Sequence, residues 1–524
     1  MGNEPQAAPG RAHPWSAGEI ARACQGELIF GTEGLQGRGF AIDTRTLAGG
    51  EVFVPLQGEH QDGHRFLAEA FRRGASGCLV RKSWLAAGGV LPPMQPDQHF
   101  AVAVDEPLAA LGRLAAYRRA RLGALCVAVT GSNGKTTTKD MIAAILSRRY
   151  ATASNVGNYN NEIGLPLTLA NLEEPVERLV LEMGMRGPGQ IAALAAIARP
   201  QVGAITTVSP VHLELLGSLE AIGRAKGELV EALPADGVAI LNASNPWVWA
   251  QKKRVAARIW AFYEAQSAAS AAGGRLTGGE ASSPVGDLDG EGSSLGVERV
   301  IRAEDIRLRG VEGADFILRA GPGEWVQVHL AAPGLHNVNN ALAAAAAALA
   351  AGADLEDVAA GLAQFRPGGM RLERVNLPGA VTLLNDSYNA SPSSVAAALA
   401  VLAASPARRR IAILGDMLEL GSQSPELHRR VGEKVAESGV DVLFALGPQC
   451  RHLAEAAARR MGAARVHYWP QYADAGALAQ AVDELLAPGD WVLLKGSRGM
   501  RMERILERLQ DRRGAPAPGP GAQE

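Results

Sequence analysis

One stretch of the sequence, Thr130-Gly-Ser-Asn-Gly-Lys-Thr-Thr-Thr138, contains the residue types that bind a nucleoside triphosphate. It follows the apolar run Leu125-Cys-Val-Ala-Val129 and opens a helix-like segment that ends near Arg149, in the order strand, glycine turn, helix. The N–H groups of such a turn bind phosphate, and the helix dipole favours the negative charge. Lys135 would then reach the terminal phosphates, and the hydroxyl of Thr136 would bind Mg²⁺. The residues of this predicted phosphate loop are Gly131, Ser132, Asn133, Gly134, Lys135, Thr136 and Thr137.

The spacing of this loop is not the most common one. Val129 stands where the G-x-x-x-x-G-K-[ST] pattern has its first glycine, so that the narrower pattern T-G-x-x-G-K-T remains. The alternative interpretation is an ordinary Gly-Ser-Asn-Gly turn between a strand and a helix. We favour a nucleoside triphosphate site.

Two possible metal ligands follow later strand-like segments. Glu182 ends the run Arg178-Leu-Val-Leu-Glu182, and His212 follows the run that begins at Val202. The carboxyl ends of parallel strands meet at one edge of a sheet, so both side chains should lie near the phosphate loop and could hold metal ions with Thr136. Taken singly, a strand-end glutamate is often a cap, and a loop histidine is often structural.

Lys226 is a lysine in a chain that otherwise prefers arginine, with eight lysines against 44 arginines. It lies on a predicted helix downstream of His212, where a solvated lysine paired with Glu220 or Glu228 is one interpretation. The other interpretation requires lysine, because an uncharged amine can take up carbon dioxide as a carbamate that binds metal. Arginine stays protonated and cannot do this.

Three further loops carry polar side chains in suitable places. The amides of Asn337 and Asn340 could read a nucleotide base, or could be turn and capping residues. The segments 385–392 and 495–501 each follow a strand in a later domain and are rich in charged and hydrogen-bonding groups. Loops of this kind, in a domain separate from the phosphate loop, suggest a cleft that closes over ATP.

The elements that must position these residues alternate between strands and helices. Buried strands are predicted at 178–183, 202–208 and 237–241, and again at 381–384, 411–414, 442–446 and 491–494. This alternation predicts the α/β fold class with parallel sheets. The length of 524 residues indicates about three domains. We predict domains at 1–122, 123–366 and 367–510, a mobile insertion at 264–297 and a disordered tail at 511–524.

Composition excludes several classes of partner. The net charge of −2 gives no basic field for nucleic acid or an anionic membrane surface. The four cysteines form no C-x-x-C pair, which argues against a zinc site or a disulfide framework and fits a reducing cytoplasm. No apolar run is suited to secretion or long enough to cross a bilayer. We expect a monomeric cytoplasmic protein with no membrane insertion.

In this order the segments resemble the ATP-dependent Mur ligases of bacterial cell-wall synthesis, from about Ala41 to Arg508. The motifs that carry the resemblance are the phosphate loop, Gly157-Asn-Tyr-Asn-Asn-Glu-Ile-Gly-Leu-Pro166, Glu182-Met-Gly-Met185, Asp386-Ser-Tyr-Asn-Ala390 and Leu414-Gly-Asp-Met-Leu-Glu-Leu-Gly421. They are most similar to the branch that joins D-alanyl-D-alanine to a UDP-N-acetylmuramoyl-tripeptide. The resemblance implies a UDP-sugar-binding N-terminal domain, a central P-loop ATPase-like parallel-sheet domain and a Rossmann-like C-terminal domain.

The resemblance also implies roles for particular residues. ATP and two Mg²⁺ ions would be held by the phosphate loop, Glu182, His212 and carbamylated Lys226. The remaining nucleotide contacts would come from Asn337, Asn340, Arg371, Asp386 and Lys495. The substrate contacts would come from Asp43, Thr44, Arg45, Gln57, Asn160, Asn161, Tyr388 and Asn389. The chain departs from the expected pattern at Met370, at Ser391 and at Ser244-Asn245.

Other functions remain as alternatives. A sibling ligase would add a single third amino acid, but the sequence has no Asp-Asn-Pro-Arg segment of the kind that such an enzyme uses for diaminopimelate. A folate polyglutamate ligase should lack the uridine-type first domain. A nucleotide-dependent switch would not need three domains, and a non-catalytic UDP-sugar-binding protein would not need the complete catalytic set.

Overall fold

The structure is a computed structural model of the chain, and it describes residues 11–58, 61–211, 213–264 and 296–514. The chain divides into two compact units. The first comprises Met1–Thr130, Arg149–Gly203 and Glu228–Val238, and the second comprises Gly131–Arg148, Ala204–Gly227 and Ala239–Glu524. His212 and most of the predicted insertion and tail lie outside the described residues.

A five-stranded sheet with the order β3-β8-β7-β6-β5 forms the N-terminal part of the first unit. β5 to β8 run parallel, whereas β3 is antiparallel to β8. Trp15, Phe40 and Phe100 are buried in its core together with the apolar side of α4. The elements are α1 (Ala17–Cys24), β3 (Glu27–Phe30), β5 (Phe40–Ala41), β6 (Val52–Phe53), α2 (Leu67–Arg72), β7 (Gly77–Arg81), α3 (Lys82–Ala86), β8 (Phe100–Val104) and α4 (Pro107–Arg121). Short pairs join β2 (Trp15–Ser16) to β4 (Gln36–Gly37) and β1 (Arg11–Ala12) to β11 (Glu173–Glu174).

The rest of the first unit contains the parallel strands β10, β12 and β9, in that order. β9 and β12 are almost entirely buried, which is typical of parallel strands covered on both faces. The helices α6 and α7 contact α4. The elements are β9 (Leu125–Thr130), β10 (Thr152–Ser154), α6 (Gly164–Ala170), β12 (Arg178–Glu182) and α7 (Gln190–Ala198).

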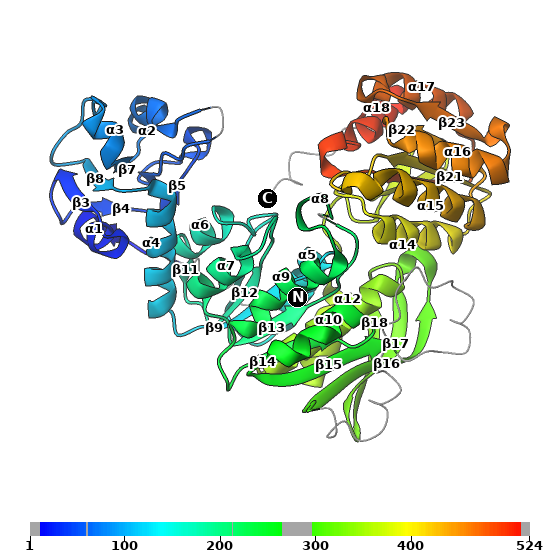
Figure 1. The fold of residues 1–524 in the computed structure, drawn as a ribbon, viewed down its shortest axis with the longest axis horizontal. Helices are drawn as coiled ribbons and strands as arrows, with labels where there is room; N and C mark the ends of the chain where they lie inside the picture. Colours follow the sequence, from blue (N-terminus) through cyan, green and yellow to red (C-terminus); the bar gives the residue numbers. More distant parts are fainter. Residues whose placement is uncertain (1–10, 59–60, 212, 265–295, 515–524) are drawn as a thin grey trace, which may run out of the picture. The chain divides into compact units, whose positions relative to one another are not determined.

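The second unit begins with α5 (Lys135–Leu146), which packs against α12 (Leu335–Ala350) and α13 (Leu355–Gln364) (Figure 1). The alanine side chains of α12 are buried along most of its length, and their small size permits close packing. β15 (Arg258–Glu264) is parallel to β16 (Arg299–Leu308), and β17 (Ala314–Gly321) and β18 (Glu324–Leu330) follow as an antiparallel meander. The unit also contains α8 (Leu213–Leu216) and α10 (Pro246–Trp249). β13 (Val202–Ile205), α9 (Leu219–Glu231) and β14 (Val238–Asn242) cross the boundaries between the units.

A six-stranded sheet with the order β19-β20-β24-β21-β22-β23 ends the second unit. Only its edge strand β19 is antiparallel, and α14 and α15 lie on one side while α17 and α18 lie on the other (Figure 1). The strands are β19 (Glu373–Leu377), β20 (Val381–Asn385), β21 (Arg409–Gly415), β22 (Val442–Leu446), β23 (Val466–Trp469) and β24 (Asp490–Lys495). The helices are α14 (Pro392–Ala403), α15 (Ser424–Glu437), α16 (Cys450–Met461), α17 (Ala475–Leu485) and α18 (Glu503–Arg513).

The α/β class predicted from the sequence is confirmed, and all seven predicted buried strands are present within a few residues of their predicted bounds. α18 extends to Arg513, so residues 511–513 of the predicted tail are helical. The sequence analysis did not predict the meander of β16, β17 and β18. Its strands alternate between buried and less buried residues, as in β17, and lack the continuous apolar run by which the parallel strands were recognised.

Candidate functional site

The phosphate loop joins β9 to α5, as the sequence predicted, and two glycines determine its shape. Gly134 is the N-cap of α5 with φ 81°, and Gly131 has φ 154°. A β carbon at Gly131 would overlap Thr206 Oγ1, and one at Gly134 would overlap Asn340 Oδ1. Both positions therefore exclude larger residues, and the loop leads directly to the N-terminus of a helix, where anions are stabilised.

The segment 206–209 holds the loop in place. Ser132 N–H donates to Thr207 O at 2.7 Å, and Thr206 Oγ1 donates to Asn133 O at 2.6 Å. The Ser132 hydroxyl donates to Ser209 O at 3.2 Å and accepts from Ser209 N–H at 3.0 Å. The side chain of Ser132 thus positions the loop.

Two lysines converge on one carbonyl group of the loop. Lys135 Nζ donates to Gly131 O at 3.0 Å and to Ser132 O at 3.3 Å, and Lys226 Nζ donates to Gly131 O at 2.9 Å. Lys226 is 2% exposed. Burial, and then the charge of Lys135, hold the pKa of the Lys226 amine well below its usual value. The structure therefore excludes a solvated, paired Lys226, and the lowered pKa favours the neutral amine that carbamate formation requires.

Glu182 lies at the carboxyl end of β12 and is 2% exposed. It pairs in register with Val129, so the edge from which the chain leaves β9 toward the phosphate loop also carries Glu182. Asn160 Nδ2 donates to Glu182 Oε1 at 2.6 Å, and Asn155 Oδ1 accepts the Glu182 N–H at 2.8 Å. A buried carboxylate with its orientation fixed by an amide is suited to a hard cation such as Mg²⁺.

The other predicted metal ligands lie in different parts of the chain. Thr136 belongs to the second unit, as does Lys226, whereas Glu182 belongs to the first. His212 lies outside the described residues. The common metal site of Thr136, Glu182, His212 and Lys226 stays a prediction.

Arg371 reaches the phosphate loop from the segment that enters the C-terminal sheet. Its Nη2 donates to Thr136 Oγ1 at 3.0 Å, and its guanidinium carbon lies 4.0 Å from the centre of the Tyr388 ring. Arg371 therefore lies at the phosphate loop although the chain has Met370 between Gly369 and Arg371, and its contact with nucleotide or substrate stays a prediction.

Lys495 and Asp386 form an ion pair next to Tyr388, with Nζ and Oδ2 2.5 Å apart. Lys495 also donates to Asn389 O at 2.8 Å. Burial raises the pKa of Asp386, and the charge of Lys495 opposes this effect. Asn389 Oδ1 accepts the N–H of Ala390 at 2.9 Å, so this side chain shapes its own loop.

The amides of Asn337 and Asn340 make hydrogen bonds at the start of α12. Asn337 Nδ2 donates to Pro333 O at 2.8 Å, and Asn340 Nδ2 donates to Asn337 Oδ1 at 3.0 Å. Asn340 Oδ1 faces Gly134. The structure thus places Asn340 at the loop, and the role of both residues in reading a base stays a prediction.

A polar cluster that the sequence analysis missed links the loop to α14. Asn133 Nδ2 lies 3.0 Å from Ser209 Oγ, 3.3 Å from Ser391 Oγ and 3.1 Å from Ser393 Oγ. Ser391 is also the N-cap of α14. The sequence signal was Ser391 itself, which departs from the family pattern at the position that contacts Asn133.

The predicted UDP-binding residues follow neighbouring parallel strands. Asp43, Thr44 and Arg45 come after β5, and Gln57 comes after β6, so the fold brings these loops to one edge of the sheet. Arg45 donates to Asp43 with Nη2 and Oδ2 2.6 Å apart, and these hydrogen bonds hold the pKa of Asp43 below its usual value. Arg81, at the end of β7, donates to Gln57 Oε1 and was not predicted as a site residue.

Asn160 and Asn161 make contacts within the first unit. Asn160 orients Glu182, as described above. Asn161 Oδ1 accepts the N–H groups of Ile163 at 3.2 Å and Gly164 at 2.8 Å, at the start of α6. Both amides have defined structural partners, and their contact with substrate stays a prediction.

Two other features resemble sites but have structural explanations. Asp416, His428 and Cys450 form a buried cluster, yet Asp416 Oδ1 accepts the Cys450 N–H at 2.7 Å and His428 Nε2 accepts the Met417 N–H at 3.0 Å. Both hydrogen bonds use atoms that would bind a metal, and the one to Asp416 caps the start of α16.

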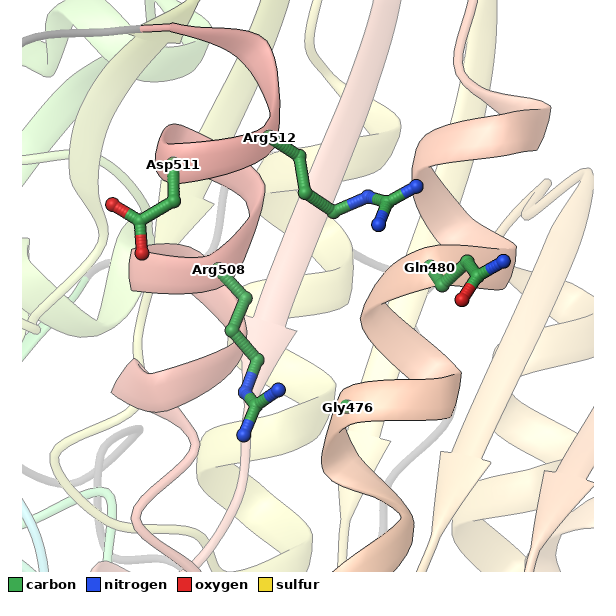
Figure 2. Close-up of a pocket in the computed structure, with 5 residues that line it drawn as sticks. All are labelled: Gly476, Gln480, Arg508, Asp511 and Arg512. Atoms are coloured by element: carbon green, nitrogen blue, oxygen red, sulfur yellow. The ribbon is translucent and has the colours of Figure 1, made fainter.

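A hollow of about 390 Å³ lies between α17 and α18, and Figure 2 shows the residues that line it. Its lining residues were not predicted as site residues, and one of its two guanidinium groups, that of Arg512, is held by Asp483 at 3.0 Å. The lining residues are Gly476, Gln480, Arg508, Asp511 and Arg512.

Across the described parts of the chain, no helix combines the length and the apolar character that a membrane span needs.

Comparison with known proteins gives consistent results over almost the whole chain. Residues 129–348 match the Mur ligase middle domain, and residues 370–498 match the Mur ligase, glutamate ligase domain. The UDP-N-acetylmuramoyl-tripeptide--D-alanyl-D-alanine ligase of Bacillus subtilis is 35% identical over 90% of this chain and 93% of its own. The Escherichia coli ligase of the same name is also 35% identical, with the same coverage.

Solved structures of similar proteins share the fold. MurF from Acinetobacter baumannii has a TM-score of 0.78 and 29% identity, and the match covers 95% of this chain and 99% of that one. The MurF ligase of Thermotoga maritima, solved in complex with ADP, has a TM-score of 0.70 and 25% identity, with 91% and 98% covered. Both matches include the N-terminal region that the two family models leave out.

Proposed function

The chain belongs to the Mur ligase family, in the group of UDP-N-acetylmuramoyl-tripeptide–D-alanyl-D-alanine ligases, and from this premise we propose its reaction. It joins D-alanyl-D-alanine to UDP-N-acetylmuramoyl-tripeptide in peptidoglycan precursor synthesis, and converts ATP to ADP and phosphate. The observation that carries this function is the phosphate loop with Lys135, Lys226 and Arg371 around it, in a chain similar to such ligases along nine-tenths of its length.

The reaction must activate a carboxylate, because joining it to an amine in water is unfavourable. The terminal carboxylate of the tripeptide attacks the γ-phosphorus of ATP, the bond to the bridging oxygen breaks, and ADP leaves. The amine of D-alanyl-D-alanine then attacks the acyl carbon of the acyl phosphate. The amine loses a proton, the bond to the phosphate oxygen breaks, and the pentapeptide and inorganic phosphate are released.

The residues of the second unit supply positive charge for the first step. Negative charge is spread over the transferring phosphoryl oxygens, and Lys135, the loop N–H groups and Arg371 are the groups that stabilise it. Arg371 approaches from the C-terminal sheet, so its contribution depends on the position of that sheet relative to the loop. Asp386, Lys495, Asn337 and Asn340 complete the proposed nucleotide site.

Magnesium fits the chemistry of the predicted donors. The hydroxyl of Thr136 and the buried carboxylate of Glu182 are oxygen ligands, and a carbamate on Lys226 would add two more. When bound, Mg²⁺ neutralises charge on the phosphates. We propose Thr136, Glu182, His212 and carbamylated Lys226 as the metal ligands, because Lys226 combines burial with a lowered pKa.

The substrate site in this proposal comprises Asp43, Thr44, Arg45 and Gln57 for the uridine diphosphate end. Asn160, Asn161, Tyr388 and Asn389 serve the peptide end. The three domains are proposed at the boundaries predicted from the sequence. We also propose a monomer in the cytoplasm, supported by four buried cysteines that are unpaired thiols.

Phosphate release tests the function directly. The purified chain is given ATP, Mg²⁺ and UDP-N-acetylmuramoyl-tripeptide, with and without D-alanyl-D-alanine, and the product is identified by mass. We expect phosphate and the pentapeptide only when the dipeptide is present. Lys135→Ala should abolish release, whereas Lys253→Ala, on an exposed lysine, should not.

Two results would contradict the proposal. Release that does not depend on the dipeptide would indicate a different acceptor. A requirement for UDP-N-acetylmuramoyl-dipeptide and a single amino acid would assign the chain to the sibling ligase.

A further inference from the structure

Arg371 lies in a segment with an unfavourable backbone conformation. The residues on either side of it, Met370 and Leu372, have φ of 60° and 56°. The left-handed region disfavours residues that carry a β carbon, because the β carbon crowds the following carbonyl oxygen. Such conformations persist where surrounding contacts determine them, and they are frequent at functional sites.

The carboxylate of Glu373 provides a contact of this kind. Its Oε2 accepts the Met370 N–H at 3.0 Å and the side-chain amide of Asn385 at 3.2 Å. Glu373 and Asn385 are also directly opposite each other in the β19–β20 ladder. The carboxylate therefore connects the strained segment to the edge of the six-stranded sheet.

The carbonyl side of the segment is fixed by the loop that follows β20. Met370 O accepts the N–H of Tyr388 at 3.2 Å, and the Tyr388 ring lies under the Arg371 guanidinium at 4.0 Å. The guanidinium in turn donates to Thr136 Oγ1 at 3.0 Å. The backbone before Arg371 and the direction of its side chain thus depend on contacts with Glu373 and Tyr388.

We propose that Glu373 is a positioning residue for Arg371: by accepting the Met370 N–H, it holds the turn that directs the guanidinium to the phosphate loop. This inference rests on the proposed ligation, in which Arg371 stabilises phosphoryl transfer. Because Glu373 is exposed, its charge is screened by solvent, and the two hydrogen bonds that it accepts carry the role.

A double-mutant cycle in the phosphate-release assay tests this role. The variants are Glu373→Ala, Arg371→Ala and the double variant, with kcat and KM for ATP measured separately. We expect Glu373→Ala alone to lower kcat/KM for ATP by about tenfold, and to change it by less than about twofold in the Arg371→Ala background. Where turnover of the double variant is too slow to measure, Arg371→Lys replaces Arg371→Ala.

Two controls separate positioning from general stability. Glu373→Gln keeps an oxygen that can accept both hydrogen bonds, so it should retain kcat/KM within about threefold. Glu437→Ala, on an exposed glutamate of α15, should have no effect, and the midpoint of thermal unfolding is recorded for every variant.

An equal loss from Glu373→Ala in both backgrounds would overturn the inference, because Glu373 would then act independently of Arg371. A large loss in Glu373→Gln would also overturn it, since the charge would then be essential. A wild-type chain that releases no phosphate would instead contradict the proposed function, so the two failures are distinguishable.

Discussion

Lys135 and Lys226 donate hydrogen bonds to the same carbonyl oxygen, that of Gly131, at 3.0 and 2.9 Å. Two ammonium groups this close repel each other, and Lys226 is the buried one. The cost is reduced when Lys226 is neutral, which agrees with its lowered pKa. The arrangement is consistent with the two proposed roles, a cationic Lys135 for phosphate and a Lys226 amine whose lowered pKa favours carbamate formation.

The carbamate proposal predicts the behaviour of substitutions at Lys226. Lys226→Ala and Lys226→Arg should each lower kcat by about a hundredfold or more, because neither can form the metal-binding anion. Added formate or acetate should partly restore the activity of Lys226→Ala, since a small carboxylate can occupy the space left by the side chain. Phosphate release measures both effects.

Lys226→Arg provides the matched comparison, because arginine fills the space but stays protonated and cannot form a carbamate. Added formate or acetate should therefore not restore the activity of Lys226→Arg. Full activity of Lys226→Ala in the absence of added carboxylate would contradict the carbamate proposal.

The lowered pKa of Lys226 also predicts a dependence of stability on pH. Between that pKa and the usual 10.5, the unfolded chain is protonated at this lysine while the folded chain is neutral, so burial of the amine costs stability. Lys226→Met removes this cost and should be more stable near neutral pH. Its advantage should shrink by up to about 1.4 kcal/mol for each pH unit as the pH rises through this window.

The measurement is the free energy of unfolding of both proteins from urea titrations at about pH 7 and about pH 9, in buffer free of bicarbonate. An advantage of Lys226→Met that stays constant over this range would show that Lys226 is not neutral in the folded chain.

Much of the fold could be predicted from the sequence because parallel strands such as β9 and β12 are continuous apolar runs. The phosphate loop could also be predicted, because its glycines, lysine and threonine are close together in the sequence and the geometry of the loop depends on these neighbours. The contacts that complete the site were not predictable. The hydrogen bonds from Asn133 to Ser391 and Ser393 join residues about 260 positions apart in the chain, and no local pattern specifies such a pairing.

The role of Glu373 was missed for a different reason. An exposed glutamate at the start of an edge strand gives no sequence signal, and the left-handed backbone of Met370 and Leu372 has no signature when the residues are not glycine. Only the structure shows that the Glu373 carboxylate accepts a hydrogen bond from the backbone N–H of Met370, beside Arg371.

Glu182 should determine the requirement for magnesium. Glu182→Gln keeps an oxygen to accept the hydrogen bond from Asn160 but removes the charge, so we expect kcat to fall by about a hundredfold and the Mg²⁺ concentration for half-maximal rate to rise. Removal of Mg²⁺ with EDTA should abolish turnover of the wild type. An unchanged Mg²⁺ dependence in Glu182→Gln would contradict a metal role, and Glu356→Gln on the surface is the control.

Substitution of Gln57 should change KM for the UDP-linked substrate only. Gln57→Ala removes the acceptor of Arg81 at the edge of the five-stranded sheet, so KM for the UDP-linked substrate should rise by about tenfold while KM for ATP stays constant. Initial rates with each substrate varied in turn measure this. A parallel rise in both KM values would indicate a loss of folding rather than a loss of substrate contact.

Gly134 and Gly189 offer a matched test of how the phosphate loop binds ATP, because both are N-cap residues with φ 81°. Alanine at either position enters the left-handed region, which costs roughly 1–2 kcal/mol. The surroundings differ: a β carbon at Gly134 would overlap Asn340 Oδ1, whereas a β carbon at Gly189 has no atom within 4 Å. Both variants should therefore lose stability, and Gly134→Ala should lose more of it.

Only Gly134→Ala should weaken ATP binding, by about tenfold or more in a calorimetric titration, since the displaced loop N–H groups no longer match the phosphates. Equal ATP affinity in the two variants would show that the loop is not the nucleotide site.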